Sequence, residues 1–236
     1  MDILTPTLPS LNITTTTISR ASIADLPVLA QIATSSQLPE AIMPFFFAAW
    51  PETTHMLAFY TARVRAKLLD PCSVFFKMTD DASGQIVGIV CVTRERGDAV
   101  VEKVLTTTAH EEGAAPLEGF NYDFARDVFG GLEGLIGFMK EREHYMLSSL
   151  AVRRAYQKRG LGRRLMMRCH ELATEDGLPI YLTAFPSAHD MYLKLGYTDE
   201  THFDVDLNEY GTKYRGFGVY RSYGMLWQPE NLRGAE

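Results

Sequence analysis

The chain has 236 residues, of which 46% are hydrophobic and 22% are charged, so it can bury a full core as one larger domain or two small ones. Its formal net charge is −6. This charge argues against nucleic acid as the main partner, because a surface that binds the nucleic acid backbone usually makes the whole domain basic.

The expected compartment and cofactor class follow from three features of the sequence: its apolar runs are short, its cysteines are few and its histidines are scattered. The most apolar run, at residues 41–51, is too short to span a membrane and is interrupted by Pro44, so we expect no membrane partner. The first residues resemble neither a signal peptide nor a transit peptide. Three cysteines without a CxxC motif predict reduced thiols and a cytoplasmic location. The six histidines are scattered, so we expect no metal site.

The first half of the chain predicts strands and helices in mixed order. A strand rich in β-branched residues begins near residue 13, and helical spacing of apolar residues follows over about 22–34. A second helix is predicted over 52–69, where it ends before a proline. Residues 73–80 and 85–96, separated by the turn residues DASG, predict two strands joined by a tight turn.

Residues 97–143 interrupt this rhythm and predict an insertion that carries one or two helices. A structureless loop of that length inside a compact domain is improbable. Its glycines at 130, 131, 134 and 137 are not followed by GK[ST], so they do not form a Walker phosphate loop. We interpret it as a helical cover over the substrate cleft or over the sheet.

The second half predicts a strand, a crossover helix and a parallel strand. Residues 145–152 form a nearly continuous apolar run, typical of a buried strand. A helix begins near Gly160 and ends at Gly177, and a strand follows over 180–185. The two strands should be parallel neighbours, with the loop before the helix at the carboxyl end of the first. A short helix up to Gly196 and a final strand pair complete the chain.

The loop QKRGLG at residues 157–162 has the composition of an anion site. Residues 153–168 contain seven lysines and arginines and no acidic residue. Amides at a helix start lack intrahelical partners, and the glycines would let phosphate oxygens approach the main chain. A pyrophosphate on this loop and a peptide-like arm along the free edge of the preceding strand together describe coenzyme A. The alternative is a solvated, basic helix face.

At these residues the sequence resembles the GNAT acetyltransferase superfamily, whose signature is Q/R-x-x-G-x-G/A between a strand and a helix. The segment AFPSAHDMYLKLGY is similar to the next strand and helix of that family, which end in Y-x-x-x-G-[FY]. The closing segments, and the stretch from Arg63 to GQIVG, resemble fungal GNAT-like proteins. The resemblance implies an α/β (α+β) GNAT fold over residues 1–236. Its twisted mixed sheet would have about seven strands, with a helical insertion between the third and fourth.

The resemblance also implies the site residues. Strand and loop backbone would bind acetyl-CoA, and Tyr192 would protonate the departing thiolate after direct attack by a neutral amine, with no metal required. The residues assigned to acetyl-CoA are Leu150, Ala151, Val152, Gln157, Lys158, Arg159, Gly160, Leu161, Gly162 and Arg163. We also expect that the insertion at 97–143 could be replaced by a short turn without loss of acetyl-CoA affinity.

The general base and the acceptor are less defined. His144 could deprotonate the amine directly or through water, although a surface histidine is the simpler interpretation. Glu102, Ser148 and Ser149 are weaker candidates for orienting the amine. Tyr192 could instead be only a core aromatic. Phe185 and Ala188 depart from the residues common at those positions, which puts acceptor positioning in question.

The sequence therefore predicts an acetyl-CoA-dependent N-acetyltransferase of a small-molecule primary amine. The alternatives are a catalytically silent acyl-CoA-binding module, and an acyltransferase that uses another acyl-CoA or a protein lysine. Monomer and homodimer both remain open.

Overall fold

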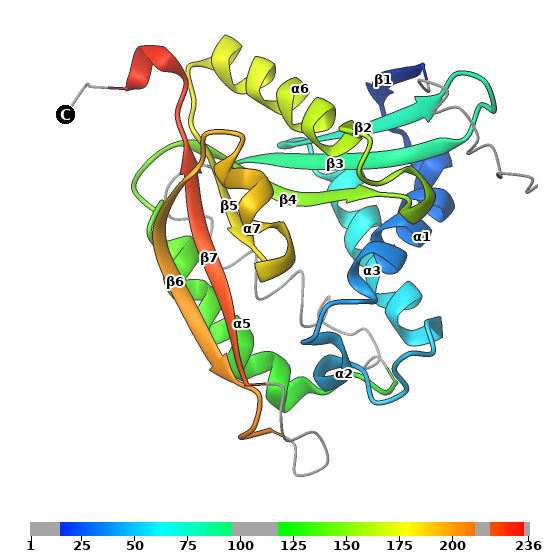
Figure 1. The fold of residues 1–236 in the computed structure, drawn as a ribbon, viewed down its shortest axis with the longest axis vertical. Helices are drawn as coiled ribbons and strands as arrows, with labels where there is room; N and C mark the ends of the chain where they lie inside the picture. The colour runs from blue at the N-terminus through cyan, green and yellow to red at the C-terminus, as the bar shows by residue number, and fades with distance from the viewer. Residues whose placement is uncertain (1–14, 96–117, 211–217, 234–236) are drawn as a thin grey trace, which may run out of the picture.

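A seven-stranded mixed sheet forms the centre of the molecule (Figure 1). The computed structural model describes residues 15–95, 118–210 and 218–233. The strands run in the order β1-β2-β3-β4-β5-β7-β6, and all neighbours are antiparallel except β4 and β5. Their bounds are β1 (Thr16–Arg20), β2 (Ser73–Asp80), β3 (Ile86–Glu95), β4 (His144–Val152), β5 (Ile180–Ala184), β6 (Thr198–Asp206) and β7 (Val219–Trp227). The parallel pair of β4 and β5 is the one that the sequence predicts.

Helices cover both faces of this sheet. Their bounds are α1 (Leu26–Gln37), α2 (Met43–Phe46), α3 (Thr54–Leu69), α5 (Tyr122–Gly137), α6 (Leu161–Asp176) and α7 (Pro186–Leu193). Alternate residues of a strand point to opposite faces. On β3, Val90 and Val92 pack in the cluster that contains α6 residues, whereas Ile89 and Cys91 pack with α1 and α3. Helices α6 and α7 therefore share one face, and α1 and α3 cover the other.

The crossover helix α6 shows how the sequence determines the packing. Leu165, Met166 and Cys169 are each at most 1% exposed, in agreement with the predicted apolar face. A fully buried leucine or methionine side chain contributes roughly 1.5–3 kcal/mol to folding. The helix ends at Gly177, whose left-handed φ of 65° is compatible with the predicted glycine stop.

Helix α5 belongs to the predicted insertion, but it is part of the core. The Tyr181 hydroxyl on β5 donates a 2.7 Å hydrogen bond to the Leu135 carbonyl of α5, and the Phe203 ring of β6 fills the space beside Gly131. Phe45 and Phe46 of α2 pack against Phe124 of α5, so the aromatic run of the sequence packs in the interior. Replacing this helix by a short turn would expose that core, so the expected effect on acceptor binding would be accompanied by a loss of stability. The remainder of the insertion, including Glu102, lies outside the described residues.

Candidate functional site

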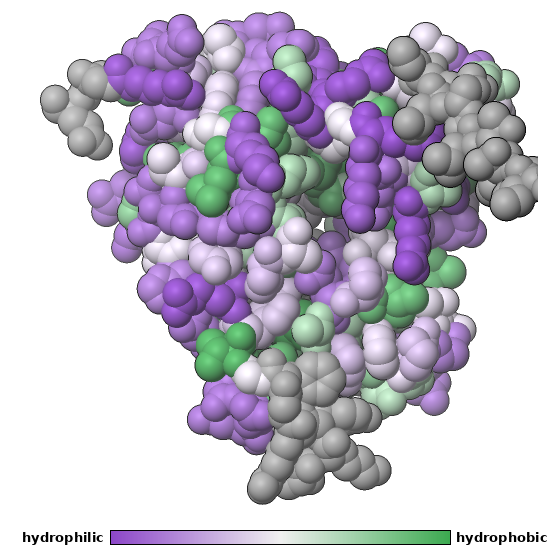
Figure 2. All heavy atoms as spheres, in the orientation of Figure 1, coloured by the Kyte–Doolittle hydropathy of each residue, from purple (hydrophilic) through white to green (hydrophobic). Residues whose placement is uncertain are grey.

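The two central strands separate halfway along their length and leave a gap. Residues 145–147 of β4 pair with residues 180–182 of β5, and the last two residues of β5 then pair only with β7. Residues 144–146 are buried, whereas residues 147–150 are partly exposed although β4 lies in the middle of the sheet. Figure 2 shows the surface hollowed near the centre of this view, over the region where the strands separate in Figure 1. The gap is thus accessible to a ligand beside β4.

The main chain of β4 offers hydrogen-bonding groups to this gap. The Arg153 amide donates to a β3 carbonyl at 2.8 Å, whereas the Val152 carbonyl accepts a 3.0 Å hydrogen bond from the Gln157 side chain. Because successive residues of a strand direct their main-chain groups to opposite sides, Val152 and Leu150 face the gap. The main-chain groups of Ala151 face β3. Two of the three β4 residues assigned to acetyl-CoA therefore have backbone groups directed at the gap.

The loop at the end of the gap has the geometry of an anion site. Lys158 and Gly160 have left-handed φ values of 59° and 77°, and α6 begins at the next residue. The first-turn amides of α6 have no partner within the helix and carry the positive end of its dipole. A Cβ added at Gly162 would lie 3.7 Å from the Met191 sulfur, an ordinary contact. The space beside Gly162 is therefore not filled by other protein atoms. The backbone amides and glycines of this loop fit a diphosphate group.

The basic cluster divides into cations that serve the fold and cations that remain available. Arg153 donates to the Ile86 carbonyl at 2.7 Å, Arg164 binds Thr16 of β1, and Arg168 pairs with Glu171 at 2.9 Å. Arg159 stacks on the Tyr156 ring at 5.3 Å. Within the described residues Lys158 and Arg163 make no hydrogen bond or ion pair. The seven cations within residues 153–168 thus supply a smaller positive charge at the loop than their number suggests.

Tyr192 lies on α7, on the same sheet face as α6. Its side chain is 6% exposed and packs edge to face against Tyr197, with ring centroids 5.5 Å apart. Burial raises the pKa of Tyr192 well above its usual value, so the hydroxyl is protonated at neutral pH. In the part of the chain that the structure describes, the hydroxyl has no hydrogen-bond partner. It is available to donate to a ligand atom.

His144 lies at the opposite end of β4 from the anion loop. It is fully buried and pairs with Glu95 in the β3 register, so it is not the surface residue of the simpler interpretation. Its Nδ1 lies 2.8 Å from the Arg142 carbonyl, and burial lowers its pKa. It sits eight residues from Val152, roughly 26 Å along an extended strand. The structure does not bring His144 together with Tyr192 and the loop.

Ser148, one of the weaker candidates, occupies a β-bulge at the point where the gap opens. The β3 register jumps from Cys91 opposite Ser149 to Val92 opposite Leu147, which leaves Ser148 unpaired in the ladder. Its hydroxyl lies 3.2 Å from that of Thr93, which in turn accepts a 2.8 Å hydrogen bond from Lys67. These contacts hold Ser148 at the mouth of the gap.

A carboxylate that the sequence did not single out lies across the gap. Glu40, between α1 and α2, accepts hydrogen bonds from Ser187 at the start of α7 and from Tyr220 of β7, the latter at 3.2 Å. The Phe185 ring lies 6.1 Å from that of Tyr220, measured between centroids. These partners are 147 and 180 residues from Glu40 along the chain. No local sequence signal could have indicated them.

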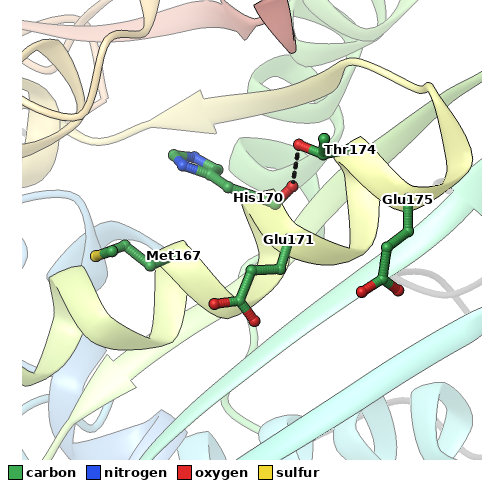
Figure 3. A pocket seen from close by; sticks show the side chains of 5 residues that line it. All are labelled: Met167, His170, Glu171, Thr174 and Glu175. Carbon is green, nitrogen blue, oxygen red and sulfur yellow. Dashed lines mark hydrogen bonds between the residues drawn. The ribbon is translucent and has the colours of Figure 1, made fainter.

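A shallow depression on the outer side of α6 is lined by Met167, His170, Glu171, Thr174 and Glu175 (Figure 3). The Nε2 atom and the carbonyl of His170 already have partners in the fold. Its ring stacks on Trp227 at 4.0 Å and lies 3.2 Å from the Tyr197 hydroxyl, and its carbonyl accepts from Thr174. This depression is separate from the gap. Among the described residues, there is no group of three metal-ligating side chains, and no helix is long and apolar enough to cross a membrane.

The partly buried His170 predicts a pH dependence of stability. Burial, with a smaller contribution from Arg233, lowers the pKa of His170 to about 4. Between its ordinary value near 6.5 and about 4, the unfolded chain binds a proton that the folded chain does not. Stability should therefore fall as the pH falls through this window. Urea unfolding of the wild type and of His170→Phe at pH 7.5 and 4.5 measures how much the free energy of unfolding of each protein falls between the two pH values. Equal pH dependence in both proteins would contradict it.

Known proteins share this architecture. Residues 36–197 match the model of the acetyltransferase (GNAT) family. The structure is similar to arylalkylamine N-acetyltransferase 2 from Aedes aegypti, with a TM-score of 0.64 and 15% identity over 90% of this chain and 98% of that chain. It is similar to a histone acetyltransferase HPA2 and related acetyltransferase from Corynebacterium glutamicum (TM-score 0.57, 17% identity, 91% and 96% covered). It also resembles Arabidopsis thaliana NAA60 in complex with acetyl-CoA (TM-score 0.50, 13% identity, 91% and 100% covered). No curated protein matches the chain by sequence.

Proposed function

Because this chain belongs to the GNAT acetyltransferase family, we propose that it transfers an acetyl group from acetyl-CoA to a primary amine of a small molecule. The observation that carries the proposal is the gap beside β4, with the α6 amides, Lys158 and Arg163 at one end and Glu40 at the other. One end suits a diphosphate and the other suits a cation. An acyl-CoA and an amine could therefore meet where the strands separate.

The residues suggest a direct transfer. A neutral amine would attack the thioester carbonyl, and the main chain of β4 that faces the gap at Leu150 would stabilise the oxyanion. The carbon–sulfur bond would then break, with the Tyr192 hydroxyl donating a hydrogen bond to the leaving sulfur and the acylated nitrogen releasing its extra proton to water. Proton transfer from tyrosine to a thiolate is uphill, because a thiol has a pKa near 8.5 and that of Tyr192 is raised. The hydrogen bond itself would therefore supply much of the stabilisation, and water would deliver the final proton.

A small-molecule acceptor is also favoured by the aromatic side chains near Glu40. Two mosquito proteins to which the structure is similar are named arylalkylamine N-acetyltransferase 2 and arylalkylamine N-acetyltransferase like 5b. Such acceptors carry one ammonium group and one ring. The likeness to fungal members stays a prediction, since the structures compared above come from an insect, a bacterium and a plant.

The proposal predicts thiol release that depends on an amine. With acetyl-CoA alone, free thiol should appear only at the rate of hydrolysis, and an acceptor amine should raise that rate at least tenfold. A panel of arylalkylamines, polyamines, amino sugars and lysine peptides, followed with a thiol reagent, identifies the class. Tight acetyl-CoA binding without stimulation by any amine would instead support the silent acyl-CoA-binding module. A preference for lysine peptides or for a longer acyl group would support the other alternative.

A further inference from the structure

Glu40 connects two parts of the molecule that otherwise face each other across the gap. It follows α1, which packs on the α3 side of the sheet, whereas Ser187 begins α7 and Tyr220 lies on β7. Its two carboxylate oxygens accept one hydrogen bond each, Oε1 from Ser187 and Oε2 from Tyr220. The carboxylate therefore lies directly at the boundary of the gap, on the side away from the anion loop.

The charge of Glu40 is not neutralised by its neighbours. Both of its donors are uncharged hydroxyls, and no ion pair joins it to a cation within residues 15–95, 118–210 and 218–233. Arg63 is the nearby cation on α3, and its guanidinium lies over the Phe59 ring, 5.5 Å from the centroid. Glu40 is half-buried, and Tyr220 is 6% exposed. A partly desolvated carboxylate without a cation is a strong site for one.

Aromatic rings surround this carboxylate. Tyr220 bonds to it directly, Phe185 lies beside Tyr220, and Tyr60 is close enough that the Glu40 charge adds to the effect of burial in raising the Tyr60 pKa. Phe185 and Tyr60 are only partly buried, so each has surface left for a ligand. Rings of this kind bind another ring by stacking or by edge contacts, worth about 0.5–1.5 kcal/mol beyond the area buried.

We propose that Glu40 binds the ammonium group of the acceptor, and that Phe185, Tyr60 and Tyr220 select acceptors that carry an aromatic ring close to that group. This inference rests on the proposed acetyl transfer and names its substrate class. An entering ammonium replaces one or both hydroxyl donors on the carboxylate, and it releases a proton to water before its nitrogen attacks the thioester. Ser187 is exposed and can turn to water, so the exchange leaves no buried donor without a partner at that position. Phe185 departs from the small polar residue that is common at this position in the family it resembles. In this proposal its ring serves acceptor recognition.

The substitution Glu40→Gln tests the charge with little change in shape. Glutamine keeps an oxygen that can accept from Ser187 or Tyr220, but it does not attract an ammonium. Asp204→Asn is the matched control, because it removes the same charge from β6, where Asp204 pairs with Arg221. Two nucleophiles that carry the same phenyl ring but differ in charge distinguish the effect of the Glu40 charge from the effect of packing against the ring. 2-Phenylethylamine is cationic at pH 7, whereas phenylhydrazine is largely neutral.

We expect Glu40→Gln to lower kcat/KM for 2-phenylethylamine by about tenfold or more, the effect of losing roughly 1.4 kcal/mol. The loss with phenylhydrazine should be below about threefold, and the acetyl-CoA Kd should not change. Asp204→Asn should resemble the wild type with both nucleophiles. A linear alkylamine should be at least about tenfold poorer than 2-phenylethylamine in the wild type. Equal losses with the two nucleophiles, or none, would overturn the role of Glu40 and leave it a structural contact.

Binding measurements separate this inference from the proposed function. Calorimetric titration of 2-phenylethylamine into the complex with coenzyme A reports the amine site without any turnover. Binding that Glu40→Gln weakens, in a protein that releases no thiol, would support the site and contradict the transfer activity. Turnover of amines that Glu40→Gln leaves unchanged would support the activity and contradict the site.

Discussion

Replacing Gly162 by aspartate should abolish acetyl-CoA binding, with a loss of at least about a hundredfold in affinity, while the fold survives. A Cβ at this position meets only the Met191 sulfur at 3.7 Å and a Val152 methyl at 4.0 Å, so the side chain itself has room. Gly162 lies in the first turn of α6, where an acidic side chain is favourable to the helix. The same carboxylate would occupy the positive end of the helix and repel a diphosphate.

Calorimetric titration of acetyl-CoA into the variant measures this loss, and circular dichroism with a thermal melt verifies the fold. Gly162→Ala is the control, since it adds the Cβ without the charge and should weaken binding less. Gly160→Asp gives a less direct answer, because Gly160 has a φ of 77° and any other residue there adds backbone strain. Unchanged affinity in a folded Gly162→Asp protein would show that the diphosphate binds elsewhere.

The sequence predicted the elements of this fold well because the patterns that define them are local. The β-strands at 73–80 and 180–184, and the glycines at both ends of α6, depend on residues close together in the chain. The position of the loop also followed, because a right-handed strand-helix-strand unit places it at the carboxyl end of β4.

Properties that depend on distant contacts could not be predicted in this way. Arg164 belongs to the basic run in sequence, yet its guanidinium binds Thr16, 148 residues away. His144 was predicted at the surface, but it is fully buried and its ring packs edge to face against the Tyr181 ring. Glu40 lies in a segment without a motif and becomes part of the gap only when α7 and β7 reach it. Charge and burial at each position were thus decided by residues that no short pattern contains.

Turnover should fall by roughly a hundredfold or more when Tyr192 is replaced by phenylalanine, the usual scale for removing one hydrogen-bond donor that stabilises developing negative charge. The ring stays packed against Tyr197, so the acetyl-CoA Kd should not change. Because the pKa of Tyr192 is raised, ionisation should not remove its donor below about pH 10, and its contribution should be constant from pH 7 to 9.

Tyr197→Phe is the matched control for the loss of a tyrosine hydroxyl beside the same helix. The Tyr197 hydroxyl lies 3.2 Å from the His170 ring, on the side of α6 that lines the depression rather than the gap, so its removal should cost about 1 kcal/mol of stability and leave turnover nearly intact. Steady-state kinetics with the acceptor identified in the amine panel, together with thermal melts with and without acetyl-CoA, compare the two variants. A lowered kcat with unchanged binding is the signature of an interaction made only in the transition state. Full activity in Tyr192→Phe would remove this hydroxyl from the mechanism and leave Ser187 or water to stabilise the departing sulfur.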